Sequence, residues 1–191
     1  RVKSKDHGIN SIDLVPMPTG SDEIEIIKKG DAVAPGSSSE LSTNPDIANT
    51  RYYWKAGLRI LDGVAYDKDG GSLDLTDGGN LLNPISNETF WDAREEEWIT
   101  ATTVDVQMLS TNSIATSALD NASEQGILYV SESASNKGVR LVNGQALPSG
   151  GFTVASENPI YIKGDYNTAN APAAVLGDAV TILSNDWDDT N

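Results

Sequence analysis

The chain contains no cysteine among its 191 residues, and it has one histidine and two methionines. The absence of cysteine excludes disulfides, thiolate nucleophiles and cysteine-ligated zinc sites. The single histidine, His7, lies in a polar leader far from any nucleophile with a catalytic context, which argues against a Ser-His-Asp triad. No apolar stretch approaches the length of a membrane-spanning helix. No signal peptide is visible, and the chain begins with Arg1.

Basic residues are also scarce. There are 13 lysines and arginines against 28 aspartates and glutamates, which gives a formal net charge of -15. Basic and acidic residues balance in residues 1–30, so residues 31–191 carry the whole acidic excess. Such a surface repels phosphate backbones and anionic lipids, so we expect no nucleic-acid partner. It tolerates cations, calcium above all.

The chain is long enough for one sizeable domain. We expect residues 1–50 to form a leader with one strand ending at Gly30 and a long loop, and residues 51–191 to form a single domain. The start at Arg1 and the short polar tail predict a fragment or mature portion of a longer precursor. Contact with a membrane would then depend on an N-terminal anchor outside this sequence.

The segment after the leader is typical of a β-meander. Short apolar runs predict strands near residues 57–61, 64–67 and 72–75. Asp62-Gly63 and Asp69-Gly70 lie between these runs, and glycine adopts the positive φ of a tight turn without steric cost.

The next segment is ambiguous. Residues 86–97 fit a short capped helix that brings Trp91 and Trp98 close to one face. From residue 98 to 106 the density of β-branched side chains favours a strand. Leu109, Ile114 and Leu119 then follow at roughly helical spacing, which predicts a second short helix.

Short apolar strands recur in the last third of the chain, at Ile127–Val130, Val139–Val142, Phe152–Ala155, Ile160–Lys163, Ala174–Gly177 and Val180–Leu183. Every second strand repeats after about 20–25 residues, a period that predicts stacked rungs of two strands each. The predicted fold class is therefore mostly all-β: right-handed parallel β-helix-like rungs in the C-terminal half, after a β-meander and one or two short helices. An antiparallel β-sandwich with the same strands is the alternative. The side chains expected to face inward are Phe152, Val154, Ile160, Ile162, Val175, Val180 and Ile182.

Several segments of residues 52–189 resemble a family of bacterial exported proteins. They are "AGLRI", "FWDARE", "GILYVSES" and, most specifically, "ENPIYIKGDYN" followed by "PAAVLGDAVTILSN". Members of that family carry an N-terminal type IV pilus-assembly-associated, minor-pilin-like segment. The resemblance implies an envelope-anchored or pilus-associated location and a β-helical region, and it brings no catalytic residues. This chain lacks the hydrophobic anchor and the further strand-rich sequence of such proteins.

One acidic turn is a candidate calcium site. "DKDGGSLD" places Asp67 and Asp69 at the first and third positions of an EF-hand register, but the glycine and glutamate that the register requires are missing. A looser site of Asp67, Asp69 and Asp74 is the metal candidate, and a hairpin tip with solvated acids is the alternative.

The tail "NDWDDTN" places Asp186, Asp188 and Asp189 around Trp187. Paired carboxylates beside tryptophans are also found in glycoside hydrolases. An acidic chain offers many accidental carboxylate pairs, however, so a solvated terminal turn is the simpler interpretation. We expect no catalytic residues and no enzyme.

The function that we expect from the sequence is an extracellular or cell-surface structural or adhesive module in a bacterium, in an assembly related to type IV pili. The alternative is a polysaccharide-binding or polysaccharide-degrading protein. The expected partners are other surface or pilus proteins or glycans, and the end face of the stacked rungs is expected to be able to self-associate.

Overall fold

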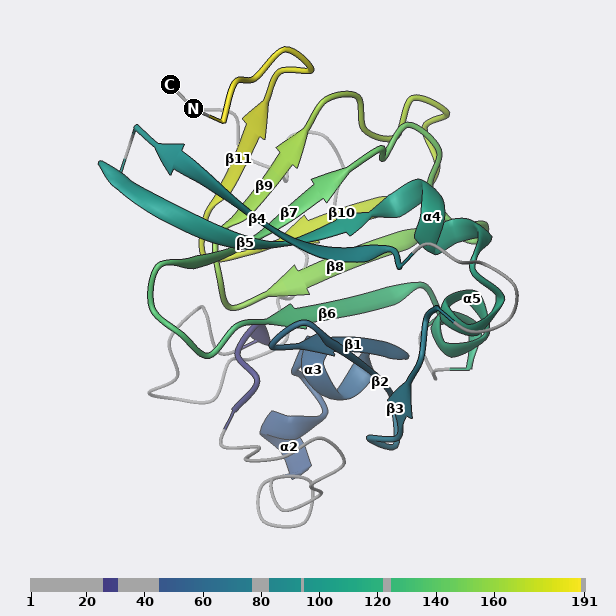
Figure 1. Ribbon diagram of the computed structural model, residues 1–191. Helices are drawn as coiled ribbons and strands as arrows, with labels where there is room; N and C mark the ends of the chain where they lie inside the picture. The colour runs from purple at the N-terminus through teal and green to yellow at the C-terminus, as the bar shows by residue number, and fades with distance from the viewer. Residues whose placement is uncertain (1–25, 31–44, 77–82, 94, 122–124, 190–191) are drawn as a thin grey trace, which may run out of the picture.

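The computed structural model describes residues 26–30, 45–76, 83–93, 95–121 and 125–189. Two β-sheets dominate these residues (Figure 1). The predicted leader strand ahead of Gly30 falls largely outside them.

The strands of the first sheet, sheet A, lie in the order β10-β8-β6-β1-β2-β3. They are β1 (Leu58–Leu61), β2 (Val64–Asp67), β3 (Ser72–Leu73), β6 (Ile127–Ser131), β8 (Phe152–Ser156) and β10 (Ala173–Leu176). Sheet B has the order β11-β9-β7-β5-β4. Its strands are β4 (Ile85–Asp92), β5 (Glu97–Asp105), β7 (Lys137–Val142), β9 (Ile160–Lys163) and β11 (Val180–Leu183).

From β6 onward the chain adds one strand to each sheet in turn, and successive strands within a sheet pair in parallel. Val175 lies opposite Val154 in sheet A, and Ile182 lies opposite Ile162 in sheet B. The parallel pairing that the sequence period predicts is therefore confirmed for β8 with β10 and for β9 with β11.

The predicted fold class is nevertheless wrong. The protein is mixed α/β with two mostly parallel sheets, and it is neither a closed β-helix nor an antiparallel sandwich. A sequence period predicts how many strands each turn of the chain contributes, but it does not define whether the turns close into a tube. Here antiparallel strands border both sheets at one end, with β2 and β3 in sheet A and β4 in sheet B.

The meander prediction is confirmed by β1, β2 and β3, although β3 is shorter than expected. Asp62 and Gly63, with φ of 49° and 77°, form the first turn in the left-handed region. Gly70 provides the second turn with φ of 86°.

The predicted helix over residues 86–97 is wrong, because this segment forms β4 and the turn into β5. Phe90 pairs with Ile99 and Trp91 with Trp98, the two indole rings lying 5.7 Å apart in a T-shaped arrangement. These cross-strand contacts outweigh the local capping signals that favoured a helix. The tight turn contains Glu96 at φ of 56°.

The second predicted helix is confirmed, as two short helices: α4 (Val106–Thr111) and α5 (Ser113–Asp120). Asp105 caps α4 by accepting a hydrogen bond from the backbone of Met108, and Asn112 caps α5 by accepting from Ile114 and Ala115.

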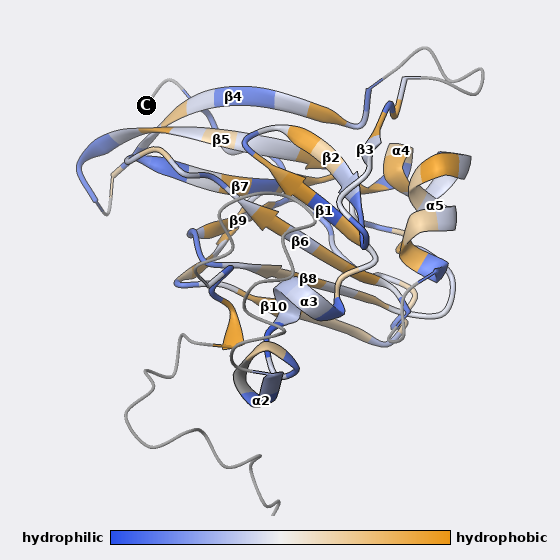
Figure 2. Cartoon of the chain, turned by 90° about the horizontal axis from the view of Figure 1, so that it is seen from below, coloured by the Kyte–Doolittle hydropathy of each residue, from blue (hydrophilic) through white to orange (hydrophobic). Residues whose placement is uncertain are grey.

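The main hydrophobic core lies between the two sheets, and α4 and α5 pack against it. In Figure 2 hydrophobic colours follow the strands of both layers, whereas the middle of β4 is hydrophilic. Phe152, Val154, Ile160 and Ile162 are buried as predicted. Val180 and Ile182 are not, with exposed fractions of 45% and 78%, because β11 is an edge strand of sheet B.

Part of the outer face of sheet A is covered by α3 (Tyr52–Lys55), whose Tyr53 packs against Tyr129 of β6. The short helix α2 (Pro45–Ala48) precedes α3. The Tyr129 hydroxyl donates to the carbonyl oxygen of Ile27, and the buried Arg59 guanidinium lies 4.4 Å from the Tyr53 ring centroid. No helix among the described residues is long and apolar enough to cross a membrane.

Candidate functional site

The outer face of sheet B is built by the two-residue alternation of its strands. In β7 the side chains of Val139 and Leu141 face the core, so Arg140 between them faces outward. Arg140 lies opposite Thr103 of β5 and Tyr161 of β9 in the parallel ladders. A buried arginine thus occupies the middle of a sheet face that points away from the main core.

Arg140 is fully buried and is held by two acidic residues. Its guanidinium donates to both carboxylate oxygens of Asp189, one at 2.9 Å, and to Oε2 of Glu88 at 2.8 Å. The guanidinium carbon lies 4.3 Å from the Phe90 ring centroid. Burial by itself lowers the pKa of Arg140, but the hydrogen bonds to Asp189 and Glu88 outweigh burial and raise the pKa overall.

A small second core surrounds this arginine. It consists of Phe90, Ile99, Ala101, Tyr161 and Leu183, with Trp187 packed against them. Phe90 and Tyr161 meet edge to face at 4.8 Å, and the Tyr161 hydroxyl donates to Asp92 at 2.6 Å. The tail that carries Trp187 and Asp189 therefore covers the middle of the outer face.

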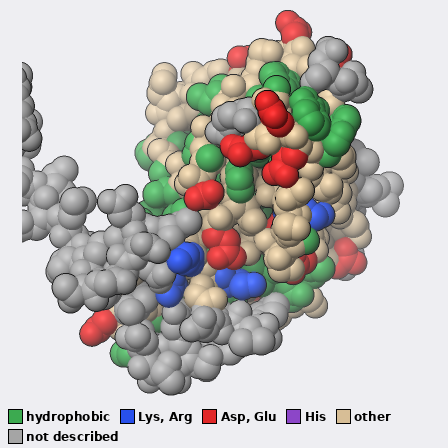
Figure 3. Space-filling view, turned by 90° about the vertical axis from the view of Figure 1, so that its left-hand side faces the viewer, with side chains coloured by type: hydrophobic (Ala, Val, Ile, Leu, Met, Phe, Trp, Pro, Cys, Tyr) green, Lys and Arg blue, Asp and Glu red, His purple; other side chains and the backbone are tan. Residues whose placement is uncertain are grey.

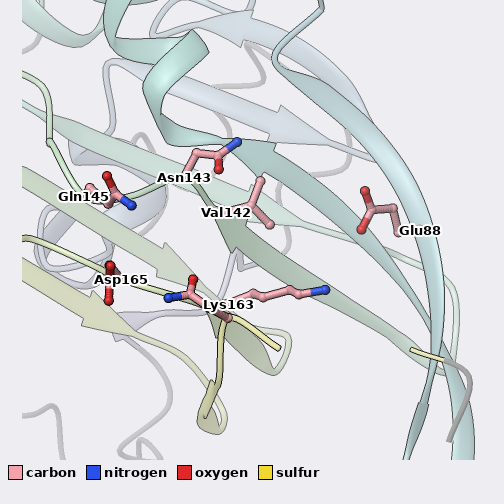
Figure 4. Close-up of a pocket in the computed structure, with 7 residues that line it drawn as sticks. Glu88, Val142, Asn143, Gln145, Lys163 and Asp165 are labelled. Atoms are coloured by element: carbon pink, nitrogen blue, oxygen red, sulfur yellow. The ribbon is translucent and has the colours of Figure 1, made fainter. Parts of the chain in front are cut away.

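A polar pocket of about 260 Å³ lies at the end of this face where β7 and β9 finish (Figure 4). Its lining comes from Glu88, Val142, Asn143, Gln145, Lys163, Asp165 and Asn185. In Figure 4 the Lys163 side chain extends from β9 toward Glu88 on β4, while Gln145 and Asp165 lie on the opposite side. Six of the seven lining side chains are polar, and Val142 is the single apolar one.

The corners after the strands place most of these polar groups. Asn143 and Gln145 follow β7, Asp165 follows β9, and Asn185 follows β11, so three successive corners meet at one end of the sheet. Asn143 adopts φ of 53°, where asparagine is tolerated, and its amide nitrogen donates to Asp105 at 2.7 Å. The amide oxygen of Asn143 therefore remains an acceptor.

The absence of a side chain at Gly164 allows Asn185 to lie close to the backbone after β9. A Cβ on Gly164 would lie 2.1 Å from the Asn185 amide oxygen, and the φ of Gly164 is +83°. Only glycine therefore lets the corner after β9 approach the corner after β11. Nearby, burial raises the pKa of Tyr166 to about 12, so its phenol remains neutral.

A second hollow of about 240 Å³ lies at the opposite end of the same face, where β7 and β9 begin. Its lining comes from Glu95, Glu97, Ile99, Asn136, Lys137, Pro159, Tyr161, Asp178 and Ala179. Arg140 lies between the two hollows. Its partner Glu88 lines the first hollow, and Tyr161, which lies opposite Arg140 in the ladder, lines the second.

Each of the predicted calcium ligands Asp67, Asp69 and Asp74 has hydrogen-bond or ion-pair partners of its own. Asp67 Oδ1 accepts from the backbone N–H groups of Asp69 and Gly71, and the carboxylate of Asp69 is bound by Lys68. Asp74 accepts from the backbone and hydroxyl of Thr76. No group of three potential metal ligands gathers within the part of the chain that the structure describes. Calcium binding at this turn stays a prediction.

The acids of the tail do not form one cluster. Asp189 is bound to Arg140, whereas Asp186 and Asp188 are exposed. His7 lies outside the described residues. The sequence patterns did not identify the polar pocket, because its residues belong to strands and corners spread from Glu88 to Asn185. The only signal was that polar residues follow each strand, and turn formation explains that pattern equally well.

Comparison of the sequence and the structure with known protein families, curated proteins and solved structures finds no match. The resemblance to pilus-associated exported proteins therefore stays a prediction.

Proposed function

We propose that this protein is a non-catalytic, surface-displayed adhesive module that binds a saccharide unit in the polar pocket at the end of sheet B. The observation that carries the proposal is the lining of the pocket. Amide groups of Asn143, Gln145 and Asn185 supply both donors and acceptors, and a sugar hydroxyl also donates and accepts. Such a set of groups suits a ligand that is rich in hydroxyls.

Size and charge narrow the ligand class. The pocket volume of about 260 Å³ is below the usual range of drug-sized sites, which begins at about 300 Å³, and it suits a single ring. Glu88 and Asp165 contribute two carboxylates against one lysine, Lys163, whose Nζ is also 3.9 Å from Asp189. This balance disfavours an anionic sugar. A neutral or amino sugar is therefore the proposed ligand.

The rigidity of the site favours binding over turnover. Glu88 is held by Arg140, and Asn143 is held by Asp105, so two of the lining side chains are fixed before any ligand arrives. A binding site with few rotamers to order loses less entropy when the ligand enters.

The test is a glycan array followed by calorimetric titration of the neutral and amino sugars that bind. We expect Asp165→Ala and Asn185→Ala each to weaken binding by about tenfold or more, because each removes hydrogen bonds to the ligand. Asp120→Ala, an exposed carboxylate at the end of α5, is the matched control and should bind normally.

Two results would count against the proposal. One is an array without any hit, which would leave a structural role in a surface or pilus-related assembly as the better explanation. The other is release of reducing sugar from a polysaccharide that disappears in Asp188→Asn, which would favour a degrading enzyme.

A further inference from the structure

Two columns of inward-facing side chains cross sheet B from β5 to β11. In the first column Val104, Leu141 and Ile162 lie opposite one another on neighbouring strands, and Ile182 comes next. The exposed fractions are 0%, 1% and 7%, and then 78% at Ile182. The apolar column that builds the core thus continues onto β11 and ends there uncovered.

The second column behaves in the same way. Thr102, Val139 and Ile160 lie opposite one another and are nearly fully buried, whereas Val180 on β11 is 45% exposed. The other end of sheet B is different, because β4 pairs along the whole of β5. One end of the sheet is thus bordered by the long antiparallel strand β4. At the other end, β11 exposes the apolar side chains of Val180 and Ile182 to solvent.

On the side away from β9, β11 has no neighbouring strand among the described residues. The N–H of Ile160 donates to Ala179 and the N–H of Gly164 donates to Leu183, so residues 179 and 183 direct their carbonyls to β9. Because backbone groups alternate in direction along a strand, those of Val180 and Ile182 point toward the open edge. Such an edge is a template for another strand.

Charge determines which kind of strand fits. The segment from Ala171 to Asn191 contains four aspartates and no lysine or arginine. Asp178 and Asp186 are exposed in the corners before and after β11. In the upper part of the face shown in Figure 3 the charged side chains are mainly acidic, and they lie among hydrophobic ones. A second copy, with its own net charge of -15, would be repelled.

We propose that β11 is a docking edge for an extended segment of another protein, with alternating apolar residues in its middle and lysine or arginine at both ends. The apolar side chains cover Val180 and Ile182, the backbone extends the ladder of sheet B, and the basic ends pair with Asp178 and Asp186. This is strand addition, in which backbone hydrogen bonds supply affinity and side chains supply specificity. Neither Val180 nor Ile182 lines the proposed sugar pocket, and the two surfaces meet at the corner after β11, where Asn185 lines the pocket.

The probe is a labelled peptide of alternating valine and threonine with two lysines at each end, and the matched probe carries glutamates in place of the lysines. Fluorescence anisotropy should show saturable binding of the lysine peptide that weakens as salt is raised. Binding of the glutamate peptide should be weaker by about tenfold or more. Hydrogen exchange of the Val180 and Ile182 amides should slow only with the lysine peptide.

Matched variants separate the docking edge from general hydrophobic attraction. Ile182→Asp and Val180→Asp should abolish binding. Val64→Asp is the control, because Val64 is also 45% exposed in a strand but lies on β2, which pairs with β1 on one side and β3 on the other. Asp178→Asn combined with Asp186→Asn should remove the preference for lysine over glutamate.

Three outcomes would overturn the proposal. The first is equal binding of the two peptides, and the second is no binding of either. The third is a homodimer in sedimentation measurements that Ile182→Asp converts to a monomer, since a second copy would then be the occupant. Sugar binding by Ile182→Asp is expected to match that of the native protein, because Ile182 does not line the pocket, so failure at the docking edge is distinguishable from failure at the pocket.

Discussion

The carboxylate of Asp189 binds the buried guanidinium of Arg140, which lies 49 positions earlier in the chain. This ion pair attaches the C-terminal tail to the centre of sheet B. The Arg140 guanidinium has no exposed surface, and its second acidic partner, Glu88, is itself partly exposed. Loss of the Asp189 charge would leave a buried cation with one partner in place of two. The tail is therefore part of the folded structure of sheet B.

Asp189→Asn should lower the free energy of unfolding by about 1–2 kcal/mol, because a hydrogen bond to a charged group is weakened while Glu88 still binds the guanidinium. Asp186→Asn, an exposed aspartate three positions earlier, should change the free energy of unfolding by less than about 0.5 kcal/mol. Urea titrations of the three proteins measure both values. Equal effects of the two substitutions would mean that the Asp189 contact contributes nothing specific.

The same contact should make stability depend on pH. The hydrogen bond from Arg140 lowers the pKa of Asp189, partial burial opposes this effect, and the charges of Arg140 and Lys163 lower the pKa further. A carboxylate with a lowered folded-state pKa stabilises the fold above its unfolded pKa, about 3.9, and this stabilisation disappears as pH falls through the folded-state value.

The stability difference between the native protein and Asp189→Asn should therefore be constant near neutral pH and should shrink below about pH 4. Urea titrations of both proteins at several pH values between about 7 and about 3 follow the difference. A difference that stays the same down to the lowest pH, or that grows as pH falls, would contradict the assigned role of the Asp189 charge.

The strands and their parallel pairing could be predicted from the sequence, because four-residue apolar runs and asparagine- or glycine-rich corners are local signals. The "IYIK" strand, Ile160–Lys163, has the predicted inward Ile160 and Ile162. The choice between a closed tube and two separate sheets could not be predicted in this way. It depends on how the antiparallel strands β3 and β4 border the sheets, which is a tertiary property.

The candidate site could not be predicted from the sequence for a related reason. Alternation along β7 places Arg140 on the outer face, where an arginine is expected to be solvated. The structure buries it under Phe90 and Asp189, which come from distant segments of the chain. The polar pocket likewise joins Glu88 to Asn185 without any local motif. Only the folded arrangement shows that residues suited to turns also line one pocket.

Two glycines provide a test of how closely the turns of the chain stack. Gly63 and Gly126 have nearly the same φ, 77° and 74°. A Cβ on Gly63 would meet nothing within 4 Å, whereas a Cβ on Gly126 would lie 2.3 Å from the carbonyl oxygen of Gly151. Gly63→Ala should therefore cost only the left-handed backbone penalty, about 1–2 kcal/mol.

Gly126→Ala should cost that penalty and about 1–3 kcal/mol more, because the backbone of Gly151 must move. Thermal and urea unfolding of the two variants side by side isolate this steric part, since the backbone penalty is common to both. If the two alanine variants were equally stable, the corner at Gly126 would be less tightly packed against Gly151 than the structure indicates.

Calcium binding at the β2–β3 turn remains a prediction, and the structure defines which acids to compare. Asp67 adjoins the turn itself, since its backbone N–H donates to the carbonyl oxygen of Gly71. Asp74 lies three positions beyond Gly71, or about 10 Å along an extended strand. A cation at the turn should therefore depend on Asp67 and not on Asp74.

We expect millimolar calcium to raise the melting temperature slightly relative to a chelator, at about 2–4 °C for each kcal/mol of binding free energy. The gain should disappear in Asp67→Asn and persist in Asp74→Asn, because only the first substitution removes a carboxylate from the turn. Magnesium at the same concentration is the control for ionic strength, and its smaller ion prefers a stricter octahedral geometry. Identical melting curves in calcium and in chelator would exclude a stabilising site at this turn, and an equal loss in both variants would place the cation elsewhere on the acidic surface.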